Sequence, residues 1–190
     1  MSLKIAIIIA STRPSRVGDR VGKWVLENVA SEGRAEYALI DLAEINLPFL
    51  QDRAMPARKE YDQTSSKKWS QLIEGFDGYI LVTPEYNNSY PATLKNAIDT
   101  LYHEWSLKPA AFVGYGSMGG VRAISHLIPV LSQIDMVPRA KTSVKLIDVN
   151  KLFDEQGQLN ENNVRGNIKN LNKDLIWWAE LLKKARDERN

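Results

Sequence analysis

The sequence contains no cysteine, which excludes disulfide bonds, a thiolate nucleophile and any metal site built on cysteine. Histidine is also scarce. The two histidines, His103 and His126, stand in segments with helical periodicity and have no partner at the spacing of a metal site. We therefore interpret both as surface or structural residues and expect no metal centre.

Long hydrophobic runs are missing as well. The longest run near the start, IAIIIA, covers residues 5–10, is too short to cross a bilayer and is followed by no small-residue cleavage pattern. Neither sign of charge dominates, because 25 Lys and Arg against 23 Asp and Glu leave a net charge of +2. This bias is too weak to indicate a nucleic-acid partner. We expect a cytoplasmic protein that binds neither nucleic acid nor membrane.

Two common nucleotide-binding motifs are absent. No G-x-G-x-x-G follows the first apolar run and no G-x-x-x-x-G-K-[ST] occurs, which disfavours a Rossmann dinucleotide site and a Walker phosphate loop. Hydrophobic residues at 44% and charged residues at 25% are ordinary values for a globular chain. The length of 190 residues fits one domain, which we assign to residues 1–190.

Short apolar runs alternate with segments of helical periodicity. The runs predict strands at 3–10, 37–42, 78–83, 110–116 and about 142–149. Apolar residues three or four positions apart predict helices at 17–29, 61–74, 94–101, 121–134 and 164–182, and Pro129 should kink the fourth. Because parallel strands need right-handed crossovers, this order predicts an α/β three-layer sandwich: a five-stranded parallel sheet with helices on both faces.

Ligands of such folds bind beyond the carboxyl ends of the strands, and the loop after the first strand has an unusual composition there. This loop, ASTRPSRVG, opens the following helix. Its backbone N–H groups, its hydroxyls and the guanidinium groups of Arg13 and Arg16 would suit a phosphate. The alternative is a solvated helix cap with two ordinary surface arginines.

Two further loops leave the same edge. The loop TPEYNNSYP follows the third strand and offers an aromatic ring, an amide and backbone groups that suit the edge of a flat heterocycle. Its alternative is an Asn-rich turn whose amides satisfy their own backbone. The loop GYGSMGG follows the fourth strand, where glycines either let the backbone approach a ligand closely or only form a tight turn.

In combination, the three loops resemble those of the NAD(P)H-dependent FMN reductases, flavodoxin-like proteins that include quinone, azo-dye and chromate reductases. The resemblance runs from IAIIIASTRPSRVGDRVGKWV through LPFLQDRAMP, PEYNNSYPATLKNAID and KPAAFVGYGSMGGVRA to about residue 138. It implies a flavodoxin-like fold in which the first loop binds the FMN phosphate, the second contacts the isoalloxazine ring and the third closes the other side. The residues that it assigns to these roles are Ser11, Arg13, Arg16, Val17 and Gly18, then Pro84, Glu85, Tyr86 and Asn87, then Gly114, Tyr115 and Gly116.

This chain departs from the family pattern at two of these positions. Ala10 precedes Ser11 where many relatives have glycine, and Gly114 stands where many carry serine. The first change suits a residue with strand dihedrals. The second removes a side-chain hydrogen bond, so that contact at Gly114 would fall to the backbone.

The resemblance also implies a reaction. NADPH or NADH would reduce FMN at N5 and leave, and a quinone, azo dye, metal oxyanion or free flavin would then take its place in a ping-pong mechanism. The flavin carries this chemistry, so no catalytic side chain is expected. A homodimer or homotetramer is implied too. The basic residues Arg13, Arg16, Lys108 and Arg122 would recognise the 2′-phosphate of NADPH if any lay near the nicotinamide.

Two other functions stay open for a flavin-binding chain of this kind. One is a flavodoxin-like electron carrier, which the charge of +2 disfavours because such carriers are usually acidic. The other is a redox sensor in which turnover is incidental. The sequence decides neither NADPH against NADH, nor the electron acceptor, nor whether FMN stays bound between turnovers.

Overall fold

The computed structural model describes residues 2–189. The strands in this part of the chain are β1 (Lys4–Ile9), β2 (Glu36–Asp41), β3 (Gly78–Pro84), β4 (Pro109–Gly116), β5 (Val137–Pro138), β6 (Val144–Ile147) and β7 (Val164–Arg165). The α-helices are α1 (Gly18–Ala30), α2 (Leu42–Ile45), α3 (Thr64–Glu74), α4 (Ala92–Asp99), α5 (Val121–Gln133) and α6 (Ile168–Asp187). Every predicted strand and helix is present within a few residues of its expected bounds.

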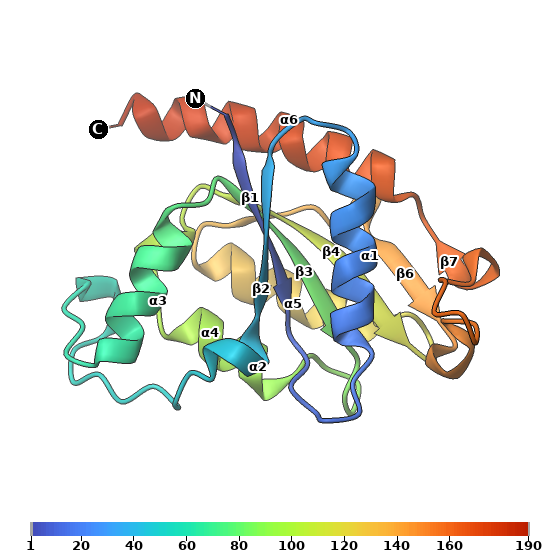
Figure 1. Ribbon diagram of the computed structural model, residues 1–190. Helices are drawn as coiled ribbons and strands as arrows, with labels where there is room; N and C mark the ends of the chain where they lie inside the picture. Colours follow the sequence, from blue (N-terminus) through green and yellow to red (C-terminus); the bar gives the residue numbers. More distant parts are fainter. Residues whose placement is uncertain (1, 190) are drawn as a thin grey trace.

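All strands belong to one sheet of order β2-β1-β3-β4-β6-β7, in which β5 pairs with β4 (Figure 1). The long strands are parallel neighbours, whereas β7 runs antiparallel to β6. The predicted α/β sandwich is therefore confirmed, but the described residues form seven strands and not five. The two missed strands, β5 and β7, have two residues each, which is too short for a periodic pattern.

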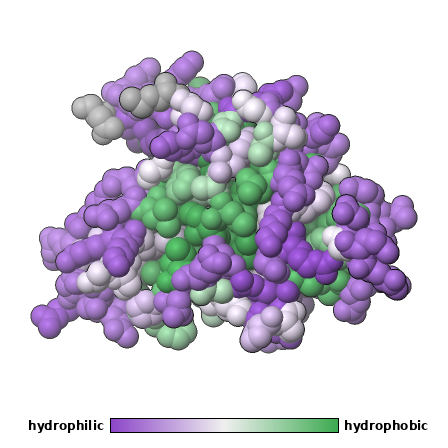
Figure 2. Space-filling model, in the orientation of Figure 1, coloured by the Kyte–Doolittle hydropathy of each residue, from purple (hydrophilic) through white to green (hydrophobic). Residues whose placement is uncertain are grey.

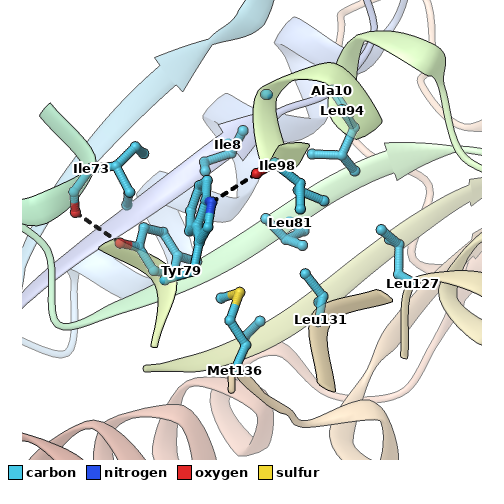
Figure 3. Packing of buried hydrophobic residues seen from close by; sticks show 14 of the residues in the cluster. Ile8, Ala10, Ile73, Tyr79, Leu81, Leu94, Ile98, Leu127, Leu131 and Met136 are labelled. Carbon is cyan, nitrogen blue, oxygen red and sulfur yellow. Dashed lines mark hydrogen bonds between the residues drawn. The ribbon is translucent and has the colours of Figure 1, made fainter. Parts of the chain in front are cut away.

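Helices cover both faces of the sheet, and alternate residues of β1 point to each. Ile5 and Ile7 pack with α1 and α6 in one buried cluster, whereas Ala6 and Ile8 pack with α3, α4 and α5 in the other. Figure 3 shows part of the second cluster, where the Tyr79 hydroxyl donates a hydrogen bond of 2.8 Å to the Ile73 carbonyl. Burial on both faces explains why the central strands are almost continuously apolar.

The outer edge of the sheet is partly open at β2. Three of its residues, Tyr37, Ala38 and Leu39, are only half-buried. Figure 2 shows apolar side chains gathered over the middle of the molecule, in the region that β2 occupies between α3 and α1 in Figure 1. Among the described residues, no helix is long and apolar enough to cross a membrane.

The last helix begins later than its periodicity predicts. Val164 was expected on its apolar face but lies in β7, and α6 starts at Ile168. The cause is local: Gly166 has φ 99°, a left-handed conformation that ends the strand, and the Asn167 side chain accepts a hydrogen bond from the Asn170 N–H as the helix cap. Pro129 lies inside α5, which continues past it to Gln133.

Candidate functional site

A cleft of about 370 Å³ lies at the carboxyl end of the sheet, where the loops after β1, β3, β4 and β6 meet. In Figure 1 the loops after β1 and β3 are at the lower edge of the molecule, opposite the two chain termini. The residues that line the cleft are Arg13, Ser15, Arg16, Val17, Pro84, Glu85, Tyr86, Tyr115, Gly116, Ser117, Val149 and Asn150. The structure thus brings eight of the twelve predicted residues to one cleft, while Ser11, Gly18, Asn87 and Gly114 lie outside its lining.

The N-terminus of α1 is open toward ligands. The residue before the helix, Val17, offers no side-chain cap, and the first hydrogen bond of the helix runs from Val21 N–H to the Val17 carbonyl at 3.0 Å. The N–H groups of the first helical turn therefore have no partner within the helix. Together with the positive end of the helix dipole, they form a site for an anion beside Val17.

Two buried hydroxyls support the base of this loop. Ser11 is fully buried and Tyr115 is 4% exposed; Ser11 Oγ and Tyr115 Oη have no hydrogen-bond partner elsewhere among the described residues, and the Ser11 hydroxyl lies close enough to that of Tyr115 to offset part of the rise in its pKa. Both oxygens converge on Gly18, since a Cβ there would lie 2.2 Å from Ser11 Oγ and 2.6 Å from Tyr115 Oη. Burial raises the pKa of the Tyr115 hydroxyl, so it remains a protonated donor. Unpaired buried polar atoms are rare in proteins and indicate a place for a ligand or water.

The two arginines of the loop differ in their contacts. The Arg16 guanidinium donates to the Ser11 carbonyl at 2.8 Å and forms an ion pair with Asp41, the last residue of β2. Arg13 is exposed and forms no ion pair within residues 2–189. Its positive charge is therefore free to meet an anion in the cleft.

The loop after β3 is a tight turn. Tyr86 and Ser89 exchange backbone hydrogen bonds of 2.8 Å and 3.0 Å, and the two residues between them, Asn87 and Asn88, have φ of 50° and 65°. Two successive positive φ values define a type I′ turn, which asparagine tolerates better than most residues. The turn holds Tyr86 at the rim of the cleft, so the Asn-rich turn and the ligand contact are compatible.

Glu85 fastens this loop to α5. Its carboxylate accepts hydrogen bonds from the Arg122 backbone N–H at 3.0 Å and from Arg122 Nη1 at 2.8 Å. Burial alone would raise the pKa of Glu85, but the hydrogen bonds and charge of Arg122 lower it below the ordinary value. The Glu85 carboxylate is thus committed to the scaffold, and Arg122 is occupied by it.

The loop after β4 depends on glycine for space. A Cβ on Gly114 would lie 2.5 Å from the Gly119 carbonyl oxygen, and Gly120, with φ 71°, lies against Gly114 as well. The serine that many relatives carry here would not fit this turn. Gly116 has φ 149°, and its open side faces Glu85 of the neighbouring loop. Gly114 therefore shapes the loop from behind the cleft.

Sequence reasoning missed part of the site. Val149 and Asn150, in a short turn after β6, line the cleft but stand in no recognisable motif. Asp41 could have been found, because it ends β2 at the same edge of the sheet as the loop after β1. Lys108, one of the candidates for a 2′-phosphate, lies at the opposite end and donates to the Ile73 and Glu74 carbonyls.

Comparisons with known proteins point to one family. The sequence profile described as NADPH-dependent FMN reductase matches residues 3–151. An NAD(P)H-dependent FMN reductase of Nectria sp is 38% identical over 149 residues, which span 75% of this chain and 74% of that protein. A 2-hydroxy-1,4-benzoquinone reductase of Burkholderia sp is 32% identical over 148 residues, spanning 72% of this chain and 74% of that protein.

Similarity extends to solved structures and to nearly the whole chain. A flavoenzyme NAD(P)H:(acceptor) oxidoreductase from Paracoccus denitrificans has a TM-score of 0.70 and 27% identity, and the match covers 96% of this chain and 98% of that one. The family profile and the curated relatives confirm the resemblance that the three loops indicated. The chain belongs to the NADPH-dependent FMN reductase family of flavin-using oxidoreductases.

Proposed function

We propose that this protein binds FMN in the cleft at the carboxyl end of the sheet, takes hydride from NADPH or NADH, and reduces a small-molecule acceptor. The observation that supports this most directly is the uncapped N-terminus of α1, which opens beside Arg13 onto a cleft of about 370 Å³. A backbone anion site next to a volume suited to a flat heterocycle matches the two halves of FMN.

The residues of the first loop fit the phosphate end. The free N–H groups at the start of α1 and the exposed Arg13 would bind it, since charge-assisted hydrogen bonds are the stronger ones. Gly18 leaves room where any side chain would displace Ser11 Oγ and Tyr115 Oη. The hydroxyls beneath the loop keep its base polar, and the nearest acidic side chain is that of Asp19 in the first turn of α1.

The loops after β3 and β4 fit the ring end. Tyr86 and Gly116 both line the cleft, which offers backbone groups and an aromatic side chain for an isoalloxazine. The backbone of the two loops is joined by a hydrogen bond of 3.2 Å from Glu85 N–H to the Tyr115 carbonyl. This link fixes their spacing, so the ring would meet preformed walls.

The cleft supplies binding and orientation more than acid–base chemistry. Glu85 is held by Arg122, and Tyr115 is buried and protonated, so neither is placed to exchange a proton with a substrate. When bound, FMN supplies the redox chemistry by accepting a hydride from the nicotinamide and passing two electrons to an acceptor that replaces it. A ping-pong order follows if both substrates use the same open face.

We propose a quinone as the first acceptor to test, because one relative is named as a benzoquinone reductase. Azo dyes, metal oxyanions and free flavin are the alternatives that an open site beside a flavin ring would also admit. We further propose that the protein acts as a homodimer, with a homotetramer as the alternative. Sedimentation at micromolar concentration tests this: a species of 21.5 kDa, the mass of one chain, would contradict it.

The decisive experiment is anaerobic. FMN is added to the purified protein, the excess is removed, and NADPH or NADH is mixed in while the flavin absorbance is followed. Retained colour that bleaches rapidly and returns on addition of 1,4-benzoquinone is the expected result. Colour that is retained but persists with both nucleotides would favour an electron carrier or redox sensor. Colour that is lost would mean that FMN does not stay bound, and a fluorescence titration in which FMN does not bind would contradict the FMN site itself.

A further inference from the structure

Asp41 lies outside the cleft but reaches the phosphate loop through Arg16. It ends β2, next to β1 in the sheet, and its Oδ2 pairs with Arg16 Nη2. The same guanidinium donates from Nη1 to the Ser11 carbonyl at 2.8 Å. The side chains of Arg16 and Asp41 are only 17% and 10% exposed, so this chain of contacts is shielded from solvent.

The second carboxylate oxygen of Asp41 is also occupied. Its Oδ1 accepts a hydrogen bond of 2.9 Å from the Ala43 N–H at the start of α2. Asp41 therefore connects three points at one edge of the sheet: the end of β2, the start of α2 and, through Arg16, the carbonyl of Ser11. Pairing of this kind restricts the rotamers of a long side chain and fixes the backbone that it holds.

We infer that Asp41 is a positioning residue for the FMN phosphate, acting through Arg16, while Arg13 provides the direct charge. This inference rests on the proposed function and adds a division of roles between the two arginines. Arg16 has two of its N–H donors committed to the protein, whereas Arg13 is exposed and unpaired within the described residues. Arg16 thus holds the loop in the shape that presents its N–H groups.

Asp41→Asn isolates the link to Arg16. Asparagine caps a helix about as well as aspartate, so the bond to Ala43 N–H should survive while the charge facing Arg16 is lost. The dissociation constants of FMN and of riboflavin, which lacks the phosphate, are measured by quenching of flavin fluorescence. We expect FMN to bind about tenfold more weakly and riboflavin to bind as in the wild type, because only the phosphate uses the loop.

Asp174→Asn is the matched control. Asp174 also pairs with an arginine, Arg139, at 2.9 Å and 3.0 Å, with side chains 21% and 23% exposed, but it lies on α6 away from the cleft. Its substitution should change neither dissociation constant. If it lowers FMN affinity as much as Asp41→Asn does, a general loss of stability explains both and the inference is overturned.

A second background tests whether Asp41 acts through Arg16. In Arg16→Gln protein the ion pair between residues 16 and 41 is already absent, so Asp41→Asn should cause no further loss of FMN affinity. An additional tenfold loss of FMN affinity in the Arg16→Gln background would overturn the inference. So would two results for Asp41→Asn alone: a loss of riboflavin affinity equal to that of FMN, or tighter FMN binding by the released Arg16. Wild-type protein that binds neither flavin would instead overturn the proposed function, so the two failures are distinguishable.

Discussion

A cavity lined by charged or polar groups lies at each end of the sheet, but the two ends differ in whether their buried polar atoms have hydrogen-bond partners. At the amino end, around a cavity of about 530 Å³, Asp77 accepts from Lys4 N–H, Lys183 and Arg186. Lys108, buried in the same wall, donates to two carbonyls and to the Tyr79 hydroxyl.

At the carboxyl end the cavity is smaller, about 370 Å³, but polar atoms are left without partners. Ser11 Oγ and Tyr115 Oη are buried and have no partner but each other among the described residues, and α1 starts without a side-chain cap. A fold has no reason to keep such groups unless something else satisfies them. Under the proposed function, the ligand site is therefore marked by polar groups that lack partners, and not by cavity volume.

The largest effect that this comparison predicts is on stability at the amino end. Asp77→Ala removes the carboxylate shared by Lys183 and Arg186, which join α6 to the start of β3, and leaves both cations in a partly buried wall. We expect the free energy of unfolding to fall by about 2–3 kcal/mol, less than for a fully buried pair because both cations can turn toward water. Urea denaturation measures this change.

FMN affinity should not follow that loss, because Asp77 is at the opposite end of the sheet from the cleft. Asp187→Ala is the control, since Asp187 is exposed and forms no ion pair within residues 2–189. A tenfold change in the dissociation constant of FMN in the Asp77 variant would break the separation between the two ends.

The next effect is on ligand binding. Gly18→Ala places a Cβ where Ser11 Oγ and Tyr115 Oη converge, and both hydroxyls must move away. Ser11 Oγ can rotate away, but the Tyr115 oxygen lies on the axis of its ring and moves only with the buried ring. We therefore expect the free energy of unfolding to fall by about 1–2 kcal/mol, although alanine favours a helix over glycine. FMN binding, measured by fluorescence titration, should weaken by about 1–2 kcal/mol because the base of the phosphate loop is displaced.

Gly75→Ala is the control for that substitution. A Cβ there meets only the Leu72 carbonyl at 3.6 Å, an ordinary contact at the end of α3. FMN affinity unchanged in Gly18→Ala would show that the unpaired hydroxyls do not mark the phosphate site.

Much of this architecture could be predicted from local pattern, and the exceptions have physical causes. Runs such as residues 5–9 are apolar on both faces because helices cover both, so the central strands could be recognised directly. The start of α6 could not be predicted, because the residue at which the helix begins depends on Gly166 adopting φ 99° and not on periodicity. Contacts distant in sequence were out of reach as well: Arg16 and Asp41 are 25 residues apart and meet only because β1 and β2 are neighbours.

The smallest predicted effect concerns Glu85, whose carboxylate is paired with Arg122 although it lies at the carboxyl end of the sheet. Its pKa is lowered in the folded protein by Arg122, so its ion pair contributes stability above the ordinary carboxyl pKa, and this contribution is lost as the pH falls through the lowered value. Glu85→Gln should therefore destabilise the protein at pH 7 by about 0.5–1 kcal/mol, the range for a pair whose arginine is half exposed.

That difference between Glu85→Gln and wild type should shrink as the pH falls through the lowered pKa of Glu85 and vanish below it, where the wild-type carboxylate is protonated as well. Thermal unfolding followed between pH 7 and acid measures it, with Glu44→Gln as the control because Glu44 is exposed and forms no ion pair within the described residues. FMN affinity should remain within about threefold, since the Glu85 backbone keeps its hydrogen bond to Tyr115. A loss of FMN affinity as large as that of Gly18→Ala would mean that the Glu85 carboxylate itself faces the ligand. Ion pairing within the protein would then not distinguish residues that support the site from residues that bind the ligand.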